Sequence, residues 1–437
     1  MINQDVIYWL WLSARCDVAS KCFDVLMQKY DDPFDLYRLE NEEIEQLGGI
    51  SNRLKEKLCD KNLAAAYDTL KYCTRNGVDI ITYADPRYPL RLKMIEDPPI
   101  LLYCKGHFPS FNTSLCVGIV GTRKMSEYGK QSAYKIGYEL AATGVVTVSG
   151  MAKGIDGVAA CGALAAKGIT VAVLGCGLET VYPNEHKALM DEISRHGAVI
   201  TEYPPKELPH GYNFPKRNRI ISGLCQAVAV IEAPVGSGAL ITAKDAIAQG
   251  RQVFALPGKV SDEGAQGPNE LIRSGAFPML CTTDLLRHYE FLYGDVLNMK
   301  ALERASAEST DVDKSPQRYG LHYAIAERAD ENKEAHRRVT LKRKKKRPDG
   351  DAPSESSDAG REAVSEQPRG ESRAECSVDE LDPLTRSVLL AIPFDKPISA
   401  DAICVRGASV AELLTALTML EIRGFVTSLP GGMYVRI

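Results

Sequence analysis

The chain has 437 residues, which is too long for one typical hydrophobic core and predicts about three domains. Its 45% hydrophobic and 25% charged residues exclude a collagen-like or wholly disordered protein. The 53 Lys and Arg nearly balance the 57 Asp and Glu, so the formal net charge is only −4. Any surface that binds a polyanion must therefore be local.

Cysteine spacing and hydropathy bear on the compartment. The 12 cysteines include no Cys-x-x-Cys pair and mostly lie in apolar runs, which predicts reduced, buried thiols and no metal site. The N-terminus lacks a basic targeting segment, and no uninterrupted apolar run reaches the ~18 residues of a membrane span. We therefore expect a cytoplasmic protein without membrane association.

Residues 1–75 predict a domain of short amphipathic helices, similar to a SAM or helix-hairpin-helix domain. Its central turn, Gly48-Gly49-Ile50-Ser51, places Ser51 as the N-cap of the next helix. In a helix-hairpin-helix motif, amides at such a helix start can hold a phosphate. Alternatively, the turn simply needs glycine at positive φ.

Residues 76–112 are punctuated by prolines and predict a connector that packs on the following domain. Two short apolar segments within it, Ile80–Tyr83 and Ile100–Cys104, could form strands.

Residues 113–290 carry the strongest pattern, in which continuous apolar runs of strand length alternate with helix-length segments. This pattern predicts an α/β fold, a doubly wound, Rossmann-like parallel sheet that is buried on both faces. The predicted strands are Cys116–Val120, Val145–Val148, Val171–Leu174, Ala198–Thr201, Ala227–Ile231 and Gln252–Leu256, and the intervening helices include Gly129–Thr143, Asp156–Lys167 and Pro183–His196.

Residues 291–380 are polar and charged, and we expect a disordered linker because they cannot bury enough apolar area to fold. The basic block Lys342–Arg347 could contact nucleic acid or act as a localisation signal, or it could be solvated and paired with the acidic segment that follows.

Residues 381–437 predict a winged helix, with helices at Pro383–Leu390, Ser399–Val405 and Ser409–Arg423 and a hairpin at Phe425–Arg436. The recognition helix of this domain would be Ser409–Arg423, and it has few cations. Protein contact or a structural role is therefore an alternative to DNA binding.

Four segments are candidates for ligand contact because of their positions next to predicted strands. Open α/β sheets bind their ligands at the carboxyl ends of the strands. They are Gly118–Lys124, Ser149–Asp156, Gly175–Leu178 and Asn213–Ile221. Their glycines allow a phosphate to approach the backbone, and Arg123 and Lys124 add positive charge. Asp156 either caps the following helix or contacts a ligand.

The fourth segment, interpreted as a loop, places Phe214, Lys216, Arg217 and Arg219 within six residues. Cations that contact phosphates and a ring that stacks on an unpaired base are typical of single-stranded nucleic-acid sites. The alternative is a structural cluster in which these arginines pair with Glu202 or Glu232.

The order of these motifs resembles the DNA processing protein A family (DprA, also called Smf). The resemblance runs from about Asp79 to Leu286 and departs at Ala160 and Ala239, where the family usually has His and Ser. The motifs are Gly121–Lys124, Ser149–Asp156, Val173–Pro183, Asn213–Ile221, Ser237–Ala243 and Phe254–Gly258.

The resemblance implies a single-stranded DNA-binding protein of natural transformation, which protects incoming DNA and helps to load the recombinase RecA. It also implies a homodimer formed through the Rossmann-like domain, without a cofactor. Carried over to this chain, the DNA contacts would be Arg123, Lys124, Ser149, Gly150, Phe214, Lys216, Arg217, Asn218, Arg219 and Lys244.

We assign no catalytic or metal-binding residue, because Gly-x-Ser-x-Gly, Walker A and His-Glu-x-x-His motifs are all absent. The alternative function is a Rossmann-like nucleotide-hydrolysing enzyme of the phosphoribohydrolase type. The Pro-Gly-Gly-x-Gly-Thr motif of such enzymes is also absent.

Overall fold

The computed structural model describes residues 5–19, 21–309, 314–321, 383–392, 398–399, 403, 416–417, 420, 425–429 and 433–436. The chain divides into two units, residues 1–347 and 348–437. Among the helices so described, none combines the length and the apolar character that a membrane span requires.

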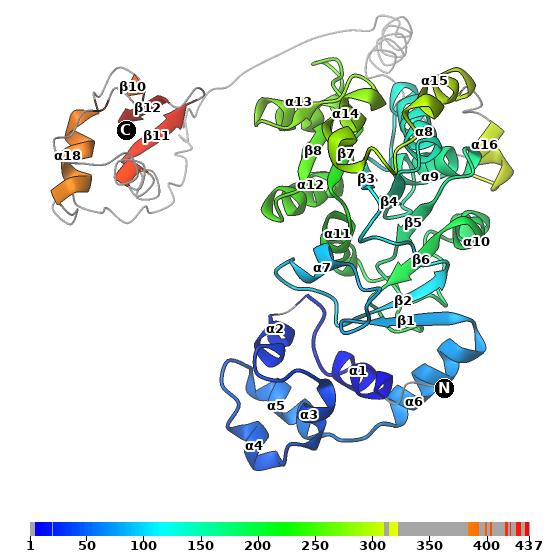
Figure 1. Ribbon diagram of the computed structural model, residues 1–437, viewed down its shortest axis with the longest axis vertical. Coiled ribbons are helices and arrows are strands. Elements are labelled where there is room, and N and C mark those ends of the chain that lie inside the picture. The colour runs from blue at the N-terminus through cyan, green and yellow to red at the C-terminus, as the bar shows by residue number, and fades with distance from the viewer. Residues whose placement is uncertain are drawn as a thin grey trace, which may run out of the picture. The chain divides into compact units, whose positions relative to one another are not determined.

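The first unit is built on a nine-stranded sheet with the order β1-β2-β6-β5-β4-β3-β7-β8-β9 (Figure 1). The strands from β3 to β9 are parallel to one another, and six of them match the predicted strands to within one residue at each end. The doubly wound, Rossmann-like prediction is therefore confirmed. The strands are β1 (Val78–Thr82), β2 (Leu101–Gly106), β3 (Cys116–Val120), β4 (Val146–Ser149), β5 (Thr170–Val173), β6 (Ala198–Thr201), β7 (Ala227–Val230), β8 (Gln252–Ala255) and β9 (Phe277–Pro278).

The segment expected to be a connector instead contributes β1 and β2 to this sheet. Strand β2 runs antiparallel to β6, and β1 runs antiparallel to β2, so the sheet is mixed rather than wholly parallel. The apolar residues of β2 are buried because they cover the edge that β6 would otherwise expose. The short helix α7 (Leu90–Lys93) lies between the two strands in the chain.

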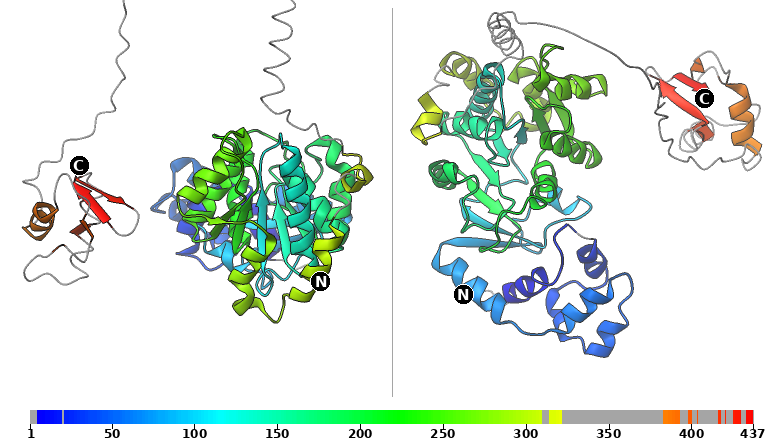
Figure 2. Two further views of the ribbon diagram at one scale, coloured as in Figure 1. Left: turned by 90° about the horizontal axis from the view of Figure 1, so that it is seen from above. Right: turned by 180° about the vertical axis from the view of Figure 1, so that it is seen from behind.

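Helices cover both faces of the sheet, as the view from above in Figure 2 shows. Alternate strand residues feed two cores: Val117 and Ile119 join one, and Cys116 and Val120 join the other. The first core includes helices α8 (Glu127–Ala142), α9 (Ile155–Ala165), α10 (Lys187–His196) and α14 (Thr282–Tyr293), and the second includes α11 (Asn213–Leu224) and α12 (Gly238–Ala248). Helix α13 (Gln266–Arg273) follows β8 in the chain, and two short 3-10 turns are η1 (Asn184–His186) and η2 (Glu263–Ala265).

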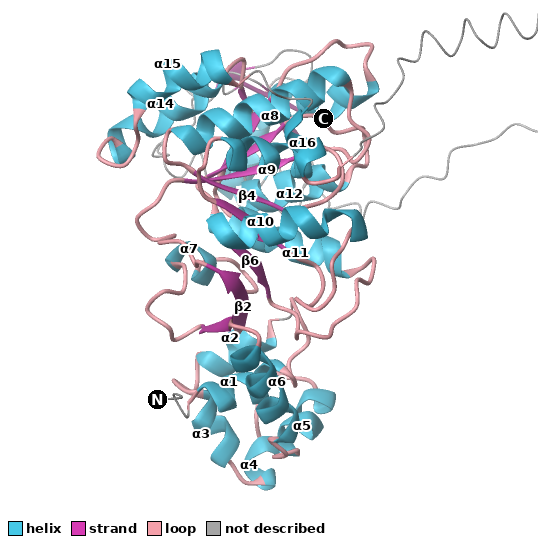
Figure 3. Ribbon diagram, turned by 90° about the vertical axis from the view of Figure 1, so that its right-hand side faces the viewer, coloured by secondary structure: helices cyan, strands magenta, loops and turns pink. Residues whose placement is uncertain are grey.

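The N-terminal helices pack beneath the β1–β2 edge (Figure 3). Ser51 is the N-cap of α5, as predicted, and its side chain accepts a hydrogen bond of 3.2 Å from the Leu54 amide. Gly49 has a φ of +81°, so the turn does need a glycine there. The helices are α1 (Val6–Ser13), α2 (Cys22–Met27), α3 (Pro33–Arg38), α4 (Asn41–Glu45), α5 (Asn52–Cys59) and α6 (Ala64–Arg75).

Part of the segment expected to be disordered is helical. Helices α15 (Met299–Glu308) and α16 (Lys314–Arg318) occupy it. Leu302 and Leu321 join the core of the first unit, and Ala305 is also buried. Asn298 caps α15, and the spacing of Leu302 and Ala305 puts both side chains on one helix face. Residues 310–313 and 322–380 of the predicted linker, including Lys342–Arg347, lie outside the described residues.

The described part of the second unit contains α18 (Pro383–Ala391) and a three-stranded sheet of β10 (Ile398–Ser399), β12 (Met433–Arg436) and β11 (Val426–Leu429). The predicted hairpin is confirmed, with Val426 opposite Arg436. Val388, Leu389, Leu417 and Leu420 share its core. Ser399, the start of the predicted helix Ser399–Val405, lies in β10 instead, whereas residues 416–417 and 420 of the predicted helix Ser409–Arg423 are helical. Most other residues of these two segments lie outside the described residues.

Candidate nucleic-acid interface

A cleft of about 1540 Å³ opens at the carboxyl edge of the first unit's sheet. Its walls include the residues that follow β3 (121–124) and those that follow β7 (232–238). The chain runs from β3 toward β4 on one side and returns to β7 on the other, so this is the topological switch point of the sheet. We call it the sheet-edge cleft.

Helix N-termini supply the cleft with positive ends. Ser126 caps α8 by accepting from the Gly129 amide at 3.0 Å, and Ser237 caps α12 by accepting from the Ala239 amide at 3.3 Å. Both serines line the cleft. The partial positive charge at these two helix starts favours an anionic ligand.

Helix α11 replaces the loop that was expected at Asn213–Ile221. Pro215 is compatible with it because a proline in the first helical turn interrupts no hydrogen bond. Arg217, Ile221 and Leu224 have the spacing of one helix face, and all three are buried. Helical periodicity therefore separates the cations of this segment: Lys216 is exposed and Arg217 points inward.

Arg217 is only 4% exposed, and its guanidinium lies beneath the Gly150 turn. Its Nη1 donates to the carbonyl oxygens of Gly150, at 3.0 Å, and of Val173. A Cβ on Gly150 would lie 2.5 Å from Arg217 Nη2, so any larger residue would displace the guanidinium from this position. Arg217 is among the residues that line the cleft, but its guanidinium is bound to these two carbonyl oxygens, so the expected phosphate contact stays a prediction.

Asp156 is the buried counterpart of Arg217. Its Oδ2 accepts a hydrogen bond of 2.9 Å from the Gly150 amide, whereas Gly154 occupies the N-cap position of α9. Burial raises the pKa of Asp156 to about 6, and the charge of Arg217 opposes that rise. Burial likewise lowers the pKa of Arg217 to about 10. Asp156 therefore closes the turn rather than capping α9. It also lies among the residues that line the cleft, so its contact with a ligand stays a prediction.

Arg219 is paired with Glu202, as the structural alternative proposed. Its two terminal nitrogens donate to the carboxylate at 3.2 and 2.7 Å, and both side chains are almost entirely buried. Glu232 instead accepts from the backbone amide of Ser126 at 2.9 Å and so holds the start of α8. Arg219 does not line the cleft.

One half of the cleft combines cations with aromatic rings. Arg123 and Lys124 are exposed, and the Arg123 guanidinium carbon lies 5.8 Å from the centre of the half-buried Phe214 ring. The ring of Tyr182 lies 5.1 Å from that of Phe214. Sequence reasoning missed Tyr182, although the Tyr-Pro pair that ends the Val173–Pro183 motif was a signal for it.

The other half of the cleft is acidic. Glu127, Asp262 and Glu263 line it, and Lys259 is a further lining residue of the same chain segment as Asp262 and Glu263. Because like charges repel, a phosphate is favoured only in the half that contains Arg123 and Lys124.

The remaining predicted contacts have different positions. Asn218 lines the cleft, while Ser149 and Gly150 are buried beneath it. Lys216 and Lys244 are exposed but do not line it. Of the two departures from the family pattern, Ala239 lines the cleft and Ala160 is buried within α9.

The turn above Arg217 is anchored from a second side by His186. This residue is fully buried, and its Nδ1 lies 3.1 Å from the Met151 carbonyl oxygen. The neighbouring Lys153 pairs with Glu185 at 2.6 Å. Burial lowers the pKa of His186 to about 4, because it disfavours the imidazolium form.

Replacing His186 with glutamine should flatten the dependence of stability on pH. Below the ordinary pKa of 6.5 the unfolded chain binds a proton on this histidine, whereas the folded protein does so only near pH 4. The contribution of His186 to the free energy of unfolding of the wild type is therefore fully present above about pH 6.5. It falls by up to about 3 kcal/mol as the pH approaches 4, and the glutamine variant lacks this decrease. Urea unfolding of both proteins across this range checks the difference, with His196→Gln, on the exposed surface of α10, as the control. Parallel profiles for wild type and His186→Gln would contradict it.

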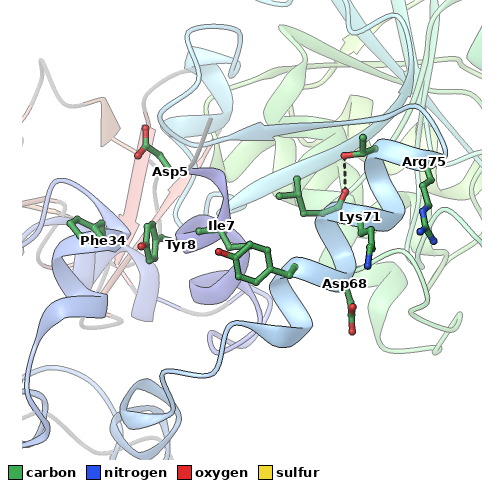
Figure 4. Close-up of a pocket in the computed structure, with 10 residues that line it drawn as sticks. Asp5, Ile7, Tyr8, Phe34, Asp68, Lys71 and Arg75 are labelled. Atoms are coloured by element: carbon green, nitrogen blue, oxygen red, sulfur yellow. Dashed lines mark hydrogen bonds between the residues drawn. The ribbon is translucent and has the colours of Figure 1, made fainter. Parts of the chain in front are cut away.

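A second hollow, of about 1130 Å³, lies among α1, α3 and α6 (Figure 4). Tyr8 and Phe34 form one side, and Lys71 and Arg75 project from α6. None of the ten predicted DNA contacts lines it. The sheet-edge cleft is therefore the candidate site.

Comparison with known proteins gives matches over both units. A family model described as DNA recombination-mediator protein A matches residues 79–290, and the DprA winged helix domain matches residues 372–432. The DNA processing protein DprA of Bacillus subtilis is 41% identical over 209 residues, which cover 48% of this chain and 70% of that protein. Protein Smf of Synechocystis is 36% identical over 290 residues, covering 65% and 73%. The X-ray structure of DNA processing protein A from Streptococcus pneumoniae is 34% identical, with a TM-score of 0.56, and the match covers 64% of this chain and 96% of that one.

Proposed function

This chain belongs to the DprA/Smf family of DNA recombination-mediator proteins, and on that premise we propose that it binds single-stranded DNA in the sheet-edge cleft. The observation that carries the proposal is that Arg123 lies over the Phe214 ring, beside Tyr182, in a cleft that Lys124 also lines. Cations of this kind bind phosphates, and a base must be unpaired to stack on an aromatic face.

Sequence preference should be weak. The exposed groups in the cationic half are two long basic side chains and aromatic faces, which contact the backbone or any base. Arg217 and Arg219, which could have read base edges, are turned into the protein.

Affinity for oligonucleotides at several salt concentrations tests the proposal. Single strands should bind more tightly than duplex, and the logarithm of the affinity should fall with the logarithm of salt by about 0.7 per phosphate contacted. An affinity that does not change between about 50 and 300 mM salt, or a higher affinity for duplex than for single strands, would overturn the proposal.

We infer the wider role from the family resemblance. In this role the protein protects incoming strands in the cytoplasm during natural transformation and helps to load RecA. A pull-down of RecA by the DNA-bound protein tests the partnership, and an empty pull-down removes it.

We further propose a homodimer formed through the Rossmann-like domain. The edge strand β9 supports it, because Phe277 and the following Leu280 are 40% and 76% exposed beside an edge whose outer side pairs with no described strand. Light scattering should give twice the mass of the chain, and Leu280→Asp should give the monomer.

The proposal contains no catalytic step. The alternative, a nucleotide-hydrolysing enzyme, requires steady release of base from a nucleoside monophosphate. An assay at high protein concentration distinguishes the two: turnover would favour the enzyme.

A further inference from the structure

Three cations from two parts of the first unit surround the carboxylate of Asp17, in the turn between α1 and α2. Lys57 Nζ, on α5, lies 2.9 Å from Asp17 Oδ1. Lys216 Nζ, on α11, donates to the carbonyl oxygen of the adjacent Val18 at 3.3 Å. The pKa of Asp17 is lowered, chiefly because Lys57 donates a hydrogen bond to it, and the charges of Arg53 and Lys216 add to the effect. We call Asp17, Arg53, Lys57 and Lys216 the junction cluster.

The junction cluster has a surplus of positive charge at the protein surface. One carboxylate faces three cations, and the Asp17 side chain is 67% exposed, as are the Arg53 and Lys216 residues to a large degree. An exposed ion pair contributes little free energy, so an incoming anion competes with Asp17 at small cost. Lys57 also donates to the Arg15 carbonyl oxygen at 3.1 Å, which holds its ammonium in place.

Helix α11 connects the cleft to the junction cluster. Lys216 is two residues beyond Phe214 on α11, and its side chain reaches the N-terminal helices. The lining of the cleft also includes Glu127, Asp262 and Glu263, which repel a phosphate. In Figures 1 and 3, α2 lies between α11 and α5, so the cluster spans from the Rossmann-like sheet to the N-terminal helices.

We propose that the junction cluster is a second phosphate-binding subsite, which takes the backbone of a single DNA strand as the strand leaves the sheet-edge cleft. Asp17 holds the three cations together until a phosphodiester displaces it. The glycine turn before α5 then has a role, because it sets the start of the helix that presents Arg53 and Lys57. This inference rests on the proposed function of the cleft.

The test compares oligothymidylates of about 6 and about 20 nucleotides on the full-length protein, because only the longer strand can occupy both sites. Arg53→Gln and Lys57→Gln should each weaken binding of the longer strand about three- to tenfold and lower its salt slope by about 0.7. Binding of the shorter strand should not change. Asp17→Asn should strengthen binding of the longer strand, and Lys71→Gln, an equal loss of charge on α6, should change neither.

The outcomes separate this inference from the function on which it rests. If wild type binds both strands but the Arg53 and Lys57 variants bind the longer strand as well as wild type does, the subsite is wrong and the cleft stands. Equal losses for both strands would also overturn the subsite, because they indicate a structural effect on the cleft. Thermal melting of Arg53→Gln, whose residue is exposed, guards against misfolding as the cause. If wild type binds neither strand, both proposals fail.

Discussion

Arg217→Ala should destabilise the first unit by about 3–5 kcal/mol, because removing the buried guanidinium leaves the charge of the buried Asp156 uncompensated. Asp156 would remain buried without its counter-charge, and the carbonyl oxygens of Gly150 and Val173 would lose their donor. Urea unfolding followed by circular dichroism measures the loss.

The pH dependence of this loss identifies its cause. The pKa of Asp156 in the folded protein is already about 6, above its ordinary value of 3.8, so the carboxyl is largely protonated at low pH even with Arg217 present. The folded protein binds a proton on Asp156 more tightly than the unfolded chain does. The favourable contribution of this proton to the free energy of folding is therefore fully present below pH 3.8 and is lost as the pH rises through 6. The cost of Arg217→Ala should accordingly be smaller at about pH 5 than at about pH 8.

A double variant provides the matched control. Adding Asp156→Asn to Arg217→Met removes both charges together, and it should recover a substantial part of the stability that Arg217→Met alone loses. If instead Arg217→Ala folds as stably as wild type and loses only DNA affinity, then Arg217 contacts DNA directly and its buried role is wrong.

Much of the fold could be predicted because parallel strands buried on both faces read as continuous apolar runs. The run Cys116–Val120 coincides with β3, and Ala198–Thr201 coincides with β6. The antiparallel addition of β1 and β2 could not be predicted in the same way. Short apolar segments between prolines do not specify which edge they will pair with.

The candidate site was harder to predict, and α11 shows why. Sequence proximity suggested that Lys216, Arg217 and Arg219 act together, but successive helical residues point about 100° apart. Lys216 therefore faces solvent, Arg217 faces the buried Gly150 turn, and Arg219 reaches Glu202. Glu202 was one of the two carboxylates proposed as partners of these arginines. Its burial depends on the packing of the whole sheet edge, so the sequence alone did not show which arginine it would pair with.

The helices after residue 298 illustrate a different limit. Their sequence is polar on average, which favoured a linker, yet a few apolar residues at helical spacing are enough to dock α15 on the core. Average composition conceals such a stripe, just as the net charge of −4 conceals the cations of the cleft.

The double variant Arg123→Gln/Lys124→Gln should have the largest effect on DNA binding. Both side chains are exposed in the cationic half of the cleft, so their loss removes phosphate contacts without opening the core. Affinity for single strands should fall about 10- to 100-fold at low salt, and the salt slope should fall by about 1.4, or about 0.7 for each lost contact. Fluorescence anisotropy over a salt series measures both quantities.

The control is Lys187→Gln/Arg195→Gln, which removes the same charge from the exposed surface of α10. It should leave the slope unchanged, because phosphate contacts rather than the net charge of the molecule determine the counterions released. The change in the salt slope then shows whether the strand is attracted by the cations of the cleft or by the net charge of the whole molecule. Equal slopes for the two double variants would mean that the cleft does not hold the strand. A reduced slope only for Arg123→Gln/Lys124→Gln would explain how a chain with a net negative charge binds a polyanion: its positive charge is concentrated where helix starts and aromatic rings already favour a single strand.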